Sequence, residues 1–519
     1  MQQLSGLDAA FLVLESGSTL AHVGSVCVLQ GEPELTVERL REVVRSRLDW
    51  LPVCRRRLVT VPGGIDHPWW AEVSDLDLGY HVTGSRLPAG PGSSDQRLAG
   101  LVASLHERRL DRTRPLWEMH LVTGLSGGRV ALYSKVHHAA LDGIAGGDLL
   151  TALLDPSPVA PAATPCGPVA PTVPERAAYL TDQVPTPAWL LARGLLNLAR
   201  WPFHAARLAA RVVRAAPAVA GTLRPLTREL TARDVLGWLR APRLWAPPTP
   251  FNAPISASRT CAFATLPLAD VKTIRRGSEL TVNDVLMTLV AGALRQWLLA
   301  HDALPAASLV AAVPVSVRGG RPGGVTGPAI PVAGRGSRDS ANRLSFLLAA
   351  LPTTLEGSAD RLEAMRASLQ RAKAGHAAIP RNLIADLTQL TPPVLGAAEW
   401  RLLVRLRALQ WGGFNLVISN VPGPSRPLYL AGAELLAWYP VSAVADGQGL
   451  NVTVITYRGT VHVGLLACPE LIPDLETMAG YLREEVAALV GSAPPATWSR
   501  NAPTRASARA CDSSSRAVT

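Results

Sequence analysis

A run of prolines divides the sequence into two patterned parts. Seven prolines lie within residues 156–174. Each proline fixes φ and removes a backbone donor, so neither a helix nor a central strand fits there. Residues 4–154, before this run, and residues 251–490, after it, both carry the periodic apolar patterns of folded structure. We therefore predict two α/β domains, residues 1–154 and 249–490.

Each predicted domain contains a clear helical pattern, over 97–110 in the first and over 281–300 in the second, where apolar residues recur every three to four positions. The other segments lack this periodicity. Residues 155–248 form a linker that is first rich in proline and then in arginine and tryptophan. Residues 319–340 have the composition of a flexible loop, and residues 491–519 that of a disordered tail.

The overall composition is that of a folded protein, with 48% hydrophobic and 18% charged residues. The six cysteines are at least 27 residues apart, which argues against zinc pairs, redox dithiols and a disulfide framework. This cysteine usage fits a reducing cytosol. Residues 1–17 contain two acidic residues and no basic one, unlike a secretory leader. We interpret them as the opening strand of the first domain.

The net charge of +11 comes almost entirely from arginine, because the sequence has only three lysines: Lys135, Lys272 and Lys373. Such a charge suits nucleic acid, anionic lipid or an acidic cofactor. None of the three lysines follows a glycine, which excludes a P-loop. No 18 apolar residues run together without an arginine or a proline, so the sequence predicts no membrane-spanning helix. Attachment to a membrane surface stays open.

The most informative pattern lies in residues 129–154, which read as a strand, a sharp turn and a helix. The turn contains His-His-x-x-x-Asp-Gly, formed by His137, His138, Asp142 and Gly143. Four fixed identities in seven positions arise by chance in roughly one chain in a thousand of this composition. The pattern therefore indicates a functional site.

Strand alternation separates the two histidines. In a strand over 130–138, His138 shares a face with Val136, whereas His137 shares the opposite face with Lys135. We therefore predict that His138 faces inward. A neutral imidazole, with an ordinary pKa of about 6.5, takes a proton from a hydroxyl or an amine at pH 7. His138 is thus the predicted general base, and His137 is predicted to orient it or to pack.

Asp142 and Gly143 have structural interpretations that compete with a chemical one. Asp142 is either the N-cap of the helix that begins at Gly143 or the partner of an arginine that locks the turn. We favour these supporting roles over a part in the chemical step, because Asp142 lies beyond the turn from His138. We keep it among the catalytic candidates in this supporting sense. Gly143 allows either a close backbone approach or an unusual φ.

Residues 124–128 match Gly-x-Ser-x-Gly, the nucleophile elbow of serine hydrolases, with Ser126 as the nucleophile. That elbow requires a strand before the serine and a helix after it. Here strand-like sequences lie on both sides. We therefore predict a hairpin loop and no nucleophile.

With these residues in place, the sequence resembles the bacterial wax ester synthase/diacylglycerol acyltransferase family. Residues 4–26 are similar to the opening of that family, and Pro115, Leu116 and Trp117 match its Pro-Leu-Trp element. Further similar segments are TPFN (249–252), VNDVL with Asn283 and Asp284, PVSVR (314–318), residues 415–433 with Ser419 and Asn420, residues 439–465 and LIPDLE (471–476).

This resemblance implies two α/β domains like those of chloramphenicol acetyltransferase, facing each other around a substrate tunnel with His138 at its end. It implies direct transfer of an acyl group from acyl-CoA, as a co-substrate, to diacylglycerol or a long-chain alcohol, giving triacylglycerol or wax esters. It implies no other cofactor, no metal and no nucleic acid. Candidate donors to the oxyanion are Asn283, Ser419 and Asn420, for which turn and cap roles are the alternative.

Two other functions remain open at this stage. A peptide-synthetase condensation domain shares the His-His-x-x-x-Asp-Gly pattern and the two-lobed fold, but it uses carrier-protein thioesters and makes amides. The absence of a carrier module and the Pro-Leu-Trp, PVSVR and SNVPGP matches favour the ester-forming function. The second alternative is a surface protein of lipid droplets that kept the fold and lost turnover.

Residues 186–245 predict attachment to a membrane or a lipid droplet, which would place the protein in the cytoplasm and on the surface of the inner membrane or of lipid inclusions. Four arginines recur every seven residues, which is nearly one side of a helix: Arg193, Arg200, Arg207 and Arg214. Leucines and tryptophans would supply the apolar side. Because Pro202 and Pro217 interrupt the run, we expect two or three short helices. Alternatively, these helices bridge the domains and bury their leucines and tryptophans.

Overall fold

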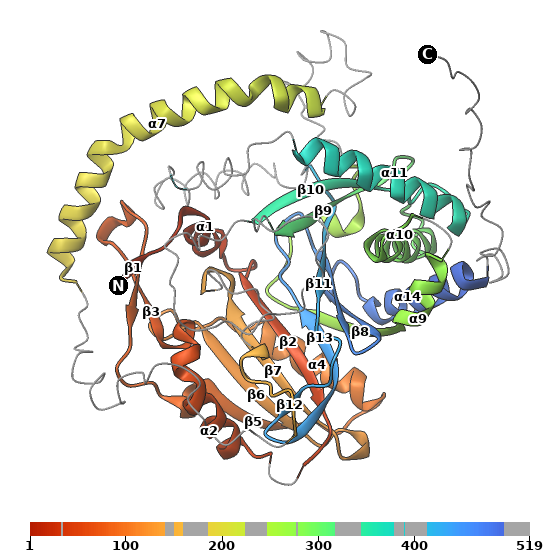
Figure 1. Ribbon diagram of the computed structural model, residues 1–519, viewed down its shortest axis with the longest axis horizontal. Coiled ribbons are helices and arrows are strands. Elements are labelled where there is room, and N and C mark those ends of the chain that lie inside the picture. Colours follow the sequence, from red (N-terminus) through yellow and green to blue (C-terminus); the bar gives the residue numbers. More distant parts are fainter. Residues whose placement is uncertain are drawn as a thin grey trace, which may run out of the picture.

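The computed structural model describes residues 1–32, 35–140, 150–158, 185–223, 246–276, 279–316, 344–377, 389 and 413–491. It contains two six-stranded sheets and a small three-stranded sheet, with helices against them (Figure 1). This is the predicted class, a mixed α/β fold with two sheet-containing halves. The substrate tunnel between the halves stays a prediction.

The first sheet has the order β12-β13-β2-β7-β6-β5. Neighbouring strands run antiparallel except for the parallel pair β5 and β6. The strands are β12 (Tyr429–Leu430), β13 (Ala433–Val441), β2 (His22–Leu29), β7 (Val130–His137), β6 (Trp117–Thr123) and β5 (Val82–Arg86). Residues 429–441 therefore complete a sheet whose other strands come from the first 140 residues.

The second sheet has the order β10-β9-β11-β14-β15-β8, in which β9, β11 and β14 are parallel neighbours. Its strands are β10 (Leu344–Leu351), β9 (Leu309–Ser316), β11 (Leu416–Pro422), β14 (Leu450–Tyr457), β15 (Thr460–Ala467) and β8 (Thr260–Pro267). The small third sheet contains β1 (Gln2–Gln3), β4 (Trp69–Glu72) and β3 (Arg56–Val59).

The helices lie in distinct places around the two sheets (Figure 1). Those beside the second sheet are α9 (Leu268–Ile274), α10 (Val282–Ala300), α11 (Ser358–Ala377) and α14 (Leu475–Gly491). The first half contains α1 (Gly6–Leu14), α2 (Val37–Arg47), α3 (Leu78–His81) and α4 (Ser94–His106). Helix α7 (Pro187–Leu223) arcs along the rim of the molecule. No helix in the described ranges is both long and apolar enough to cross a membrane.

A shared apolar cluster joins the two halves. It combines Val102 of α4 and Tyr133 of β7 with Cys261 of β8 and Leu466 of β15, all of them buried. Because apolar burial contributes about 25 cal/mol per Å², this cluster helps to hold the two halves of the chain together. The face of β7 that carries Tyr133 is therefore part of the contact between the halves.

Local sequence signals account for α10, which begins within one residue of its predicted start. The hydroxyl of Thr281 accepts a hydrogen bond from the N–H of Asp284, and the Asp284 carboxylate accepts one from the N–H of Thr281. This capping box satisfies free donors of the first turn. Asp284 thus has a structural role at the helix start.

The opening of the chain is the two-residue strand β1 followed by helix α1, so our prediction of a strand over residues 1–17 was wrong for most of that range. Ser5 caps α1 by accepting a hydrogen bond from the N–H of Asp8 at 3.2 Å. The apolar residues of this helix pack toward the core of the first half. Leu12 is buried in that core, and Phe11 is partly buried against it. The cap and the tertiary contacts therefore decide the structure of this short segment.

The prediction of two or three short helices in the linker was also wrong, because α7 is a single curved helix that contains Pro202 and Pro217 (Figure 1). A proline inside a helix removes one hydrogen bond and bends the helix. The surrounding alanines, leucines and arginines favour a helix on both sides of each proline. Their combined preference outweighs the local losses.

The Gly-x-Ser-x-Gly segment lies in the hairpin between β6 and β7, as predicted. Ser126 Oγ lies 2.7 Å from Ser94 Oγ and accepts a hydrogen bond from Arg129 at 3.0 Å. We expect Ser126→Ala to change the rate of acyl transfer by less than about twofold, because no base among the described residues is hydrogen-bonded to this hydroxyl. Steady-state assays check this. Stoichiometric labelling of Ser126 by a fluorophosphonate would contradict it.

Candidate active site

The two histidines lie where β7 ends. His137 is the last residue of β7, and its N–H donates to the carbonyl of Leu116 at 2.9 Å. The strand is thus one residue shorter than predicted, and His138 begins a 3-10 turn that extends to Ala140. The N–H of His138 donates to the carbonyl of Ala21 at 2.8 Å. The backbone of His137 is therefore held by the segment that contains Leu116, and the backbone of His138 by the segment that contains Ala21.

The ring of His138 lies against Phe11 of α1. The two ring centroids are 3.7 Å apart and the ring planes differ by 22°. His138 as a whole is half-buried, but its Nδ1 atom is fully covered and has no hydrogen-bond partner among the described residues. Burial lowers the pKa of His138 to about 4. At pH 7 this imidazole is therefore neutral and able to accept a proton.

His137 is fully buried and is held by its own turn. Its Nδ1 accepts a hydrogen bond from the N–H of Ala139 at 3.1 Å, so the neutral ring carries its proton on Nε2. That nitrogen lies 3.8 Å from Glu15 Oε1. Burial lowers the pKa of His137 to about 3, although the nearby Glu15 carboxylate opposes this shift. His137 thus stabilises the turn that presents His138.

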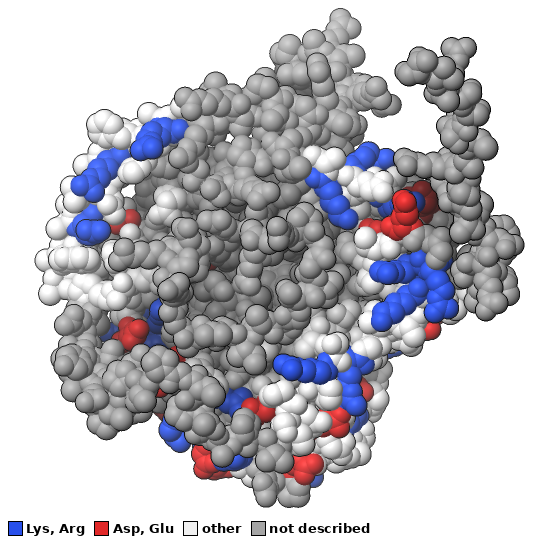
Figure 2. Space-filling model, viewed as in Figure 1, with Lys and Arg blue, Asp and Glu red and all other residues white. Residues whose placement is uncertain are grey.

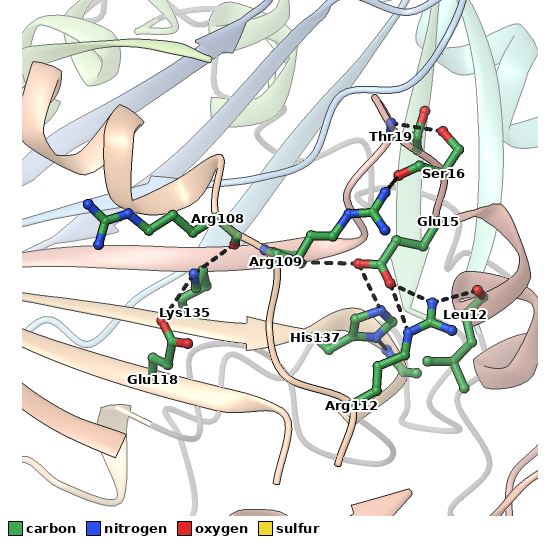
Figure 3. Close-up of polar contacts among 12 residues, drawn as sticks. Leu12, Glu15, Ser16, Thr19, Arg108, Arg109, Arg112, Glu118, Lys135 and His137 are labelled. Carbon is green, nitrogen blue, oxygen red and sulfur yellow. Dashed lines mark hydrogen bonds and ion pairs between the residues drawn. The ribbon is translucent and has the colours of Figure 1, made fainter. Parts of the chain in front are cut away.

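Glu15, at the end of α1, connects several charged and polar groups (Figure 3). One carboxylate oxygen accepts hydrogen bonds from Arg112 Nε at 3.0 Å and from Arg112 Nη2, and the other lies 3.3 Å from His22 Nε2. Burial alone raises the pKa of Glu15, but His22, His137 and Arg112 together lower it to about 2. A carboxylate therefore stays charged beside the buried His137.

A second buried charge, that of Lys135, lies on β7 two residues before His137 (Figure 3). Lys135 Nζ donates to the carbonyl of Leu105, in the last turn of α4, at 3.0 Å. It also donates to the carbonyl of Arg108, which follows α4, at 2.9 Å. It also lies 3.1 Å from Glu118 Oε2. Burial lowers the pKa of Lys135, and the Glu118 carboxylate opposes that shift. These contacts tie β7 to α4 and β6.

The Pro-Leu-Trp element lies directly beside the histidines. Leu116 supplies the carbonyl that binds the N–H of His137. Trp117 is 1% exposed, donates from Nε1 to the carbonyl of Cys54 at 3.0 Å and stacks on His81. Pro115 is buried at the start of this segment. The Pro-Leu-Trp element therefore fixes the start of β6. Strand β7, which ends at His137, pairs antiparallel with β6.

Two of the three candidate oxyanion donors lie together in the second half. Asn420 of β11 donates from Nδ2 to Asn283 Oδ1 of α10 at 3.2 Å. Ser419 precedes Asn420 in β11, and all three side chains are half-buried. No hydrogen bond among the described residues joins this group to His138. Their part in oxyanion stabilisation stays a prediction.

Asp142 and Gly143 lie outside the described residues, as do the loop over 319–340 and the tail from residue 492. Within the described ranges no three His, Cys, Asp or Glu side chains come together in a way that could hold a metal ion. The site seen here therefore consists of the histidine pair and the groups that contact it.

Sequence reasoning did not identify Phe11, Glu15 or Arg112 as parts of the site. Phe11 and Glu15 are four residues apart, a spacing that places them on one side of α1, but that signal requires the segment to be a helix. Arg112 is 97 residues from Glu15, so only the fold brings the two together.

Comparison with known proteins identifies the family of this chain. Residues 4–286 match the wax ester synthase/diacylglycerol acyltransferase catalytic domain, and residues 340–489 match the WS/DGAT C-terminal domain. A protein of Mycobacterium tuberculosis, strain CDC 1551, named provisionally as a diacylglycerol O-acyltransferase, is 33% identical over 94% of this chain and 90% of its own length. A relative of the same description from Mycobacterium bovis is 34% identical over the same shares.

Solved structures agree with the sequence matches. The wax ester synthase/diacylglycerol acyltransferase from Marinobacter aquaeolei VT8 has a TM-score of 0.63 and 28% identity, over 95% of this chain and 99% of that one. The first condensation domain of the calcium-dependent antibiotic synthetase shares the fold, with a TM-score of 0.51, 15% identity and coverage of 95% and 98%. The chain therefore belongs to the wax ester synthase/diacylglycerol acyltransferase family of acyltransferases.

Proposed function

We propose that this protein transfers a fatty acyl group from acyl-CoA directly to the hydroxyl of diacylglycerol or of a long-chain alcohol, giving triacylglycerol or wax esters. Within a chain of this family, the observation that carries the proposal is the imidazole of His138. Burial holds its pKa at about 4, so it is an uncharged base at pH 7. Acyl-CoA serves as a co-substrate, and the scheme needs no further cofactor.

In this scheme His138 removes the hydroxyl proton as the acceptor oxygen attacks the thioester carbonyl. The tetrahedral oxyanion then collapses, the carbon–sulfur bond breaks, and the leaving thiolate of CoA takes the proton from the imidazolium. The oxyanion needs hydrogen-bond donors. The candidates are Asn283, Ser419 and Asn420, and the amides of Asn283 in α10 and Asn420 in β11 are paired. His137 and Asp142 support the turn and take no part in the proton transfer.

The test uses purified protein, palmitoyl-CoA and either hexadecanol or dioleoylglycerol, with free thiol and neutral lipid followed together. We expect thiol and ester to form in equal amounts with at least one acceptor. Palmitoyl on a carrier protein, offered with an amine acceptor, tests the condensation function in parallel. Transfer from the carrier protein alone would contradict the proposal, and so would the absence of thiol release with every donor and acceptor.

We further propose that α7 attaches the protein to a membrane or lipid-droplet surface, where these substrates reside. One side of α7 packs on the protein: Leu190 is buried, and Asn197 Nδ2 donates to Asp66 Oδ2 at 2.8 Å. Four leucines on other sides of α7 are exposed by 41–53%: Leu191, Leu195, Leu196 and Leu198. Phe203 is 75% exposed. This exposure favours a lipid contact over burial of the apolar side chains between the domains.

Basic side chains lie beside this apolar surface, and Figure 2 shows them spaced along α7 at the rim of the molecule. Arg193, Arg200 and Arg207 recur every seven residues and so follow one side of the helix. Arg214 continues the series in the sequence, but its side chain lies outside the described part. Trp189 is 45% exposed and lies under the Arg193 guanidinium at 5.9 Å. Tryptophan and arginine together suit an anionic lipid interface.

We expect the variant in which these four arginines become glutamine to lose most of its flotation with anionic liposomes at low salt, because each arginine near the surface contributes about 1 kcal/mol. High salt should weaken wild-type flotation in the same direction. A control variant of equal charge replaces four exposed arginines elsewhere: Arg39, Arg45, Arg276 and Arg371. Equal flotation of the wild type and the α7 variant would show that α7 is a scaffold between the domains.

A further inference from the structure

The phenyl ring of Phe11 covers one face of the His138 imidazole. The rings are stacked, with centroids 3.7 Å apart and planes that differ by 22°. Phe11 is half-buried in α1 and packs against the core of the first half. A ring at this distance and angle prevents the imidazole from tilting toward α1.

The rings of His138 and His137 are held in different ways within the described part of the chain. A catalytic or metal-binding histidine is commonly oriented by a hydrogen bond to its second ring nitrogen. His137 has such a bond, from the N–H of Ala139 to its Nδ1. The Nδ1 atom of His138 is buried and has no such partner within the described ranges. Its backbone N–H is bound to Ala21, which fixes the main chain at this position.

Phe11 can fix the ring because α1 is itself held at both ends. At the start, Ser5 caps the helix and donates to the Asp8 carboxylate at 2.5 Å. At the end, Arg112 Nη2 donates to the carbonyl of Leu12 at 2.9 Å and also binds Glu15. Phe11 therefore sits on a helix that is anchored at both ends by hydrogen bonds to residues other than His138.

We propose that Phe11 is a positioning residue for His138. This inference rests on the proposed function, in which His138 takes the proton of the acceptor hydroxyl. The stack holds the imidazole plane in the orientation that directs a ring nitrogen at that proton. The π face of Phe11 also favours the imidazolium that exists after the proton has moved, since a cation over an aromatic ring is stabilised.

The kinetic test compares Phe11→Leu with Phe11→Tyr. Leucine keeps an apolar side chain of similar size but has no flat aromatic face, whereas tyrosine keeps the face. We expect Phe11→Leu to lower kcat about tenfold or more, since small misplacements of a reacting group are costly, while KM for palmitoyl-CoA changes less than about twofold. Phe11→Tyr should stay within about threefold of the wild type.

A matched control removes an aromatic stack elsewhere. Phe263 of β8 is stacked on Tyr439 of β13, with centroids 4.7 Å apart and planes that differ by 23°. Phe263→Leu should leave kcat within about twofold of the wild type, because this stack does not contact the histidine pair. Circular dichroism and thermal unfolding of all three variants show whether each has folded.

A second readout does not depend on activity. In protein with ring-labelled histidine, the His138 signal is the one missing from His138→Ala. A stacked phenyl ring shifts the ring protons of His138 upfield, so this shift should persist in Phe11→Tyr and disappear in Phe11→Leu.

The outcomes separate this inference from the proposed function. Loss of activity in His138→Ala with an unchanged kcat in folded Phe11→Leu would overturn the role of Phe11 and leave the proposed function standing. Equal losses in Phe11→Leu and folded Phe11→Tyr would also overturn it, because the aromatic face would then be irrelevant. Full activity in His138→Ala would overturn both.

Discussion

Replacement of His138 by alanine is expected to lower acyl transfer by about 10²–10⁴-fold while the protein stays folded, because loss of a general base typically costs this much. His138 is half-buried at the end of β7, and its neutral ring is the proposed proton acceptor. The rate is measured from thiol release with palmitoyl-CoA and the preferred acceptor, at pH 7 and under saturating conditions.

The matched variant for this prediction is His137→Ala. Its ring accepts the Ala139 N–H and lies 3.8 Å from Glu15, so its loss loosens the turn without removing the base. We expect a smaller decrease in rate than for His138→Ala. If both variants fold and His137→Ala is the less active, the assignment of the base to His138 is wrong.

The second large effect concerns stability. Gly292→Ala in α10 is expected to lower the free energy of unfolding of the second half by about 3–5 kcal/mol. A Cβ atom at this position would overlap the carboxyl group of Glu485 in α14. That carboxylate binds Arg361 at 2.6 Å, and the two side chains are 1% and 4% exposed. Glu485 cannot move aside without leaving the buried Arg361 charge unpaired, which is the source of the cost.

Gly480→Ala in α14 is the control for this substitution. A Cβ atom there meets nothing within 4 Å. Alanine should therefore stabilise the helix by about 0.5–1 kcal/mol, since glycine is the poorer helix former. Urea unfolding measures both variants. A Gly292→Ala midpoint equal to that of Gly480→Ala would contradict the packing described around Glu485.

Sequence reasoning succeeded where local chemistry decides the structure. The apolar repeat over 281–300 predicts α10, and strand-like sequences on both sides of Ser126 predict the β6–β7 hairpin. Alternation along β7 places His137 on the face of Lys135, but it does not reach His138, which begins the 3-10 turn, so the predicted face of His138 stays a prediction. Periods of two and of 3.6 residues, together with caps and turn residues, carry this information.

The sequence could not predict what depends on distant contacts. Residues 1–17 are as apolar as a strand, and only the cap at Ser5 and the packing of Leu12 distinguish the helix. The pairing of β13 with β2 joins segments more than 400 residues apart, as in the register Trp438↔Cys27. The ion pair of Glu15 with Arg112 depends on the same folding. Periodicity shows which face of an element is buried but not which partner covers it.

The most direct test of the proposed transfer is a rapid-quench experiment with stoichiometric protein and palmitoyl-CoA, in which free thiol and neutral lipid are measured from the same samples. Direct transfer predicts that thiol and ester appear at one rate, that neither appears without an acceptor, and that both are lost in His138→Ala. Release of one thiol per protein in the absence of an acceptor, or ester formation by His138→Ala at the wild-type rate, would contradict the account.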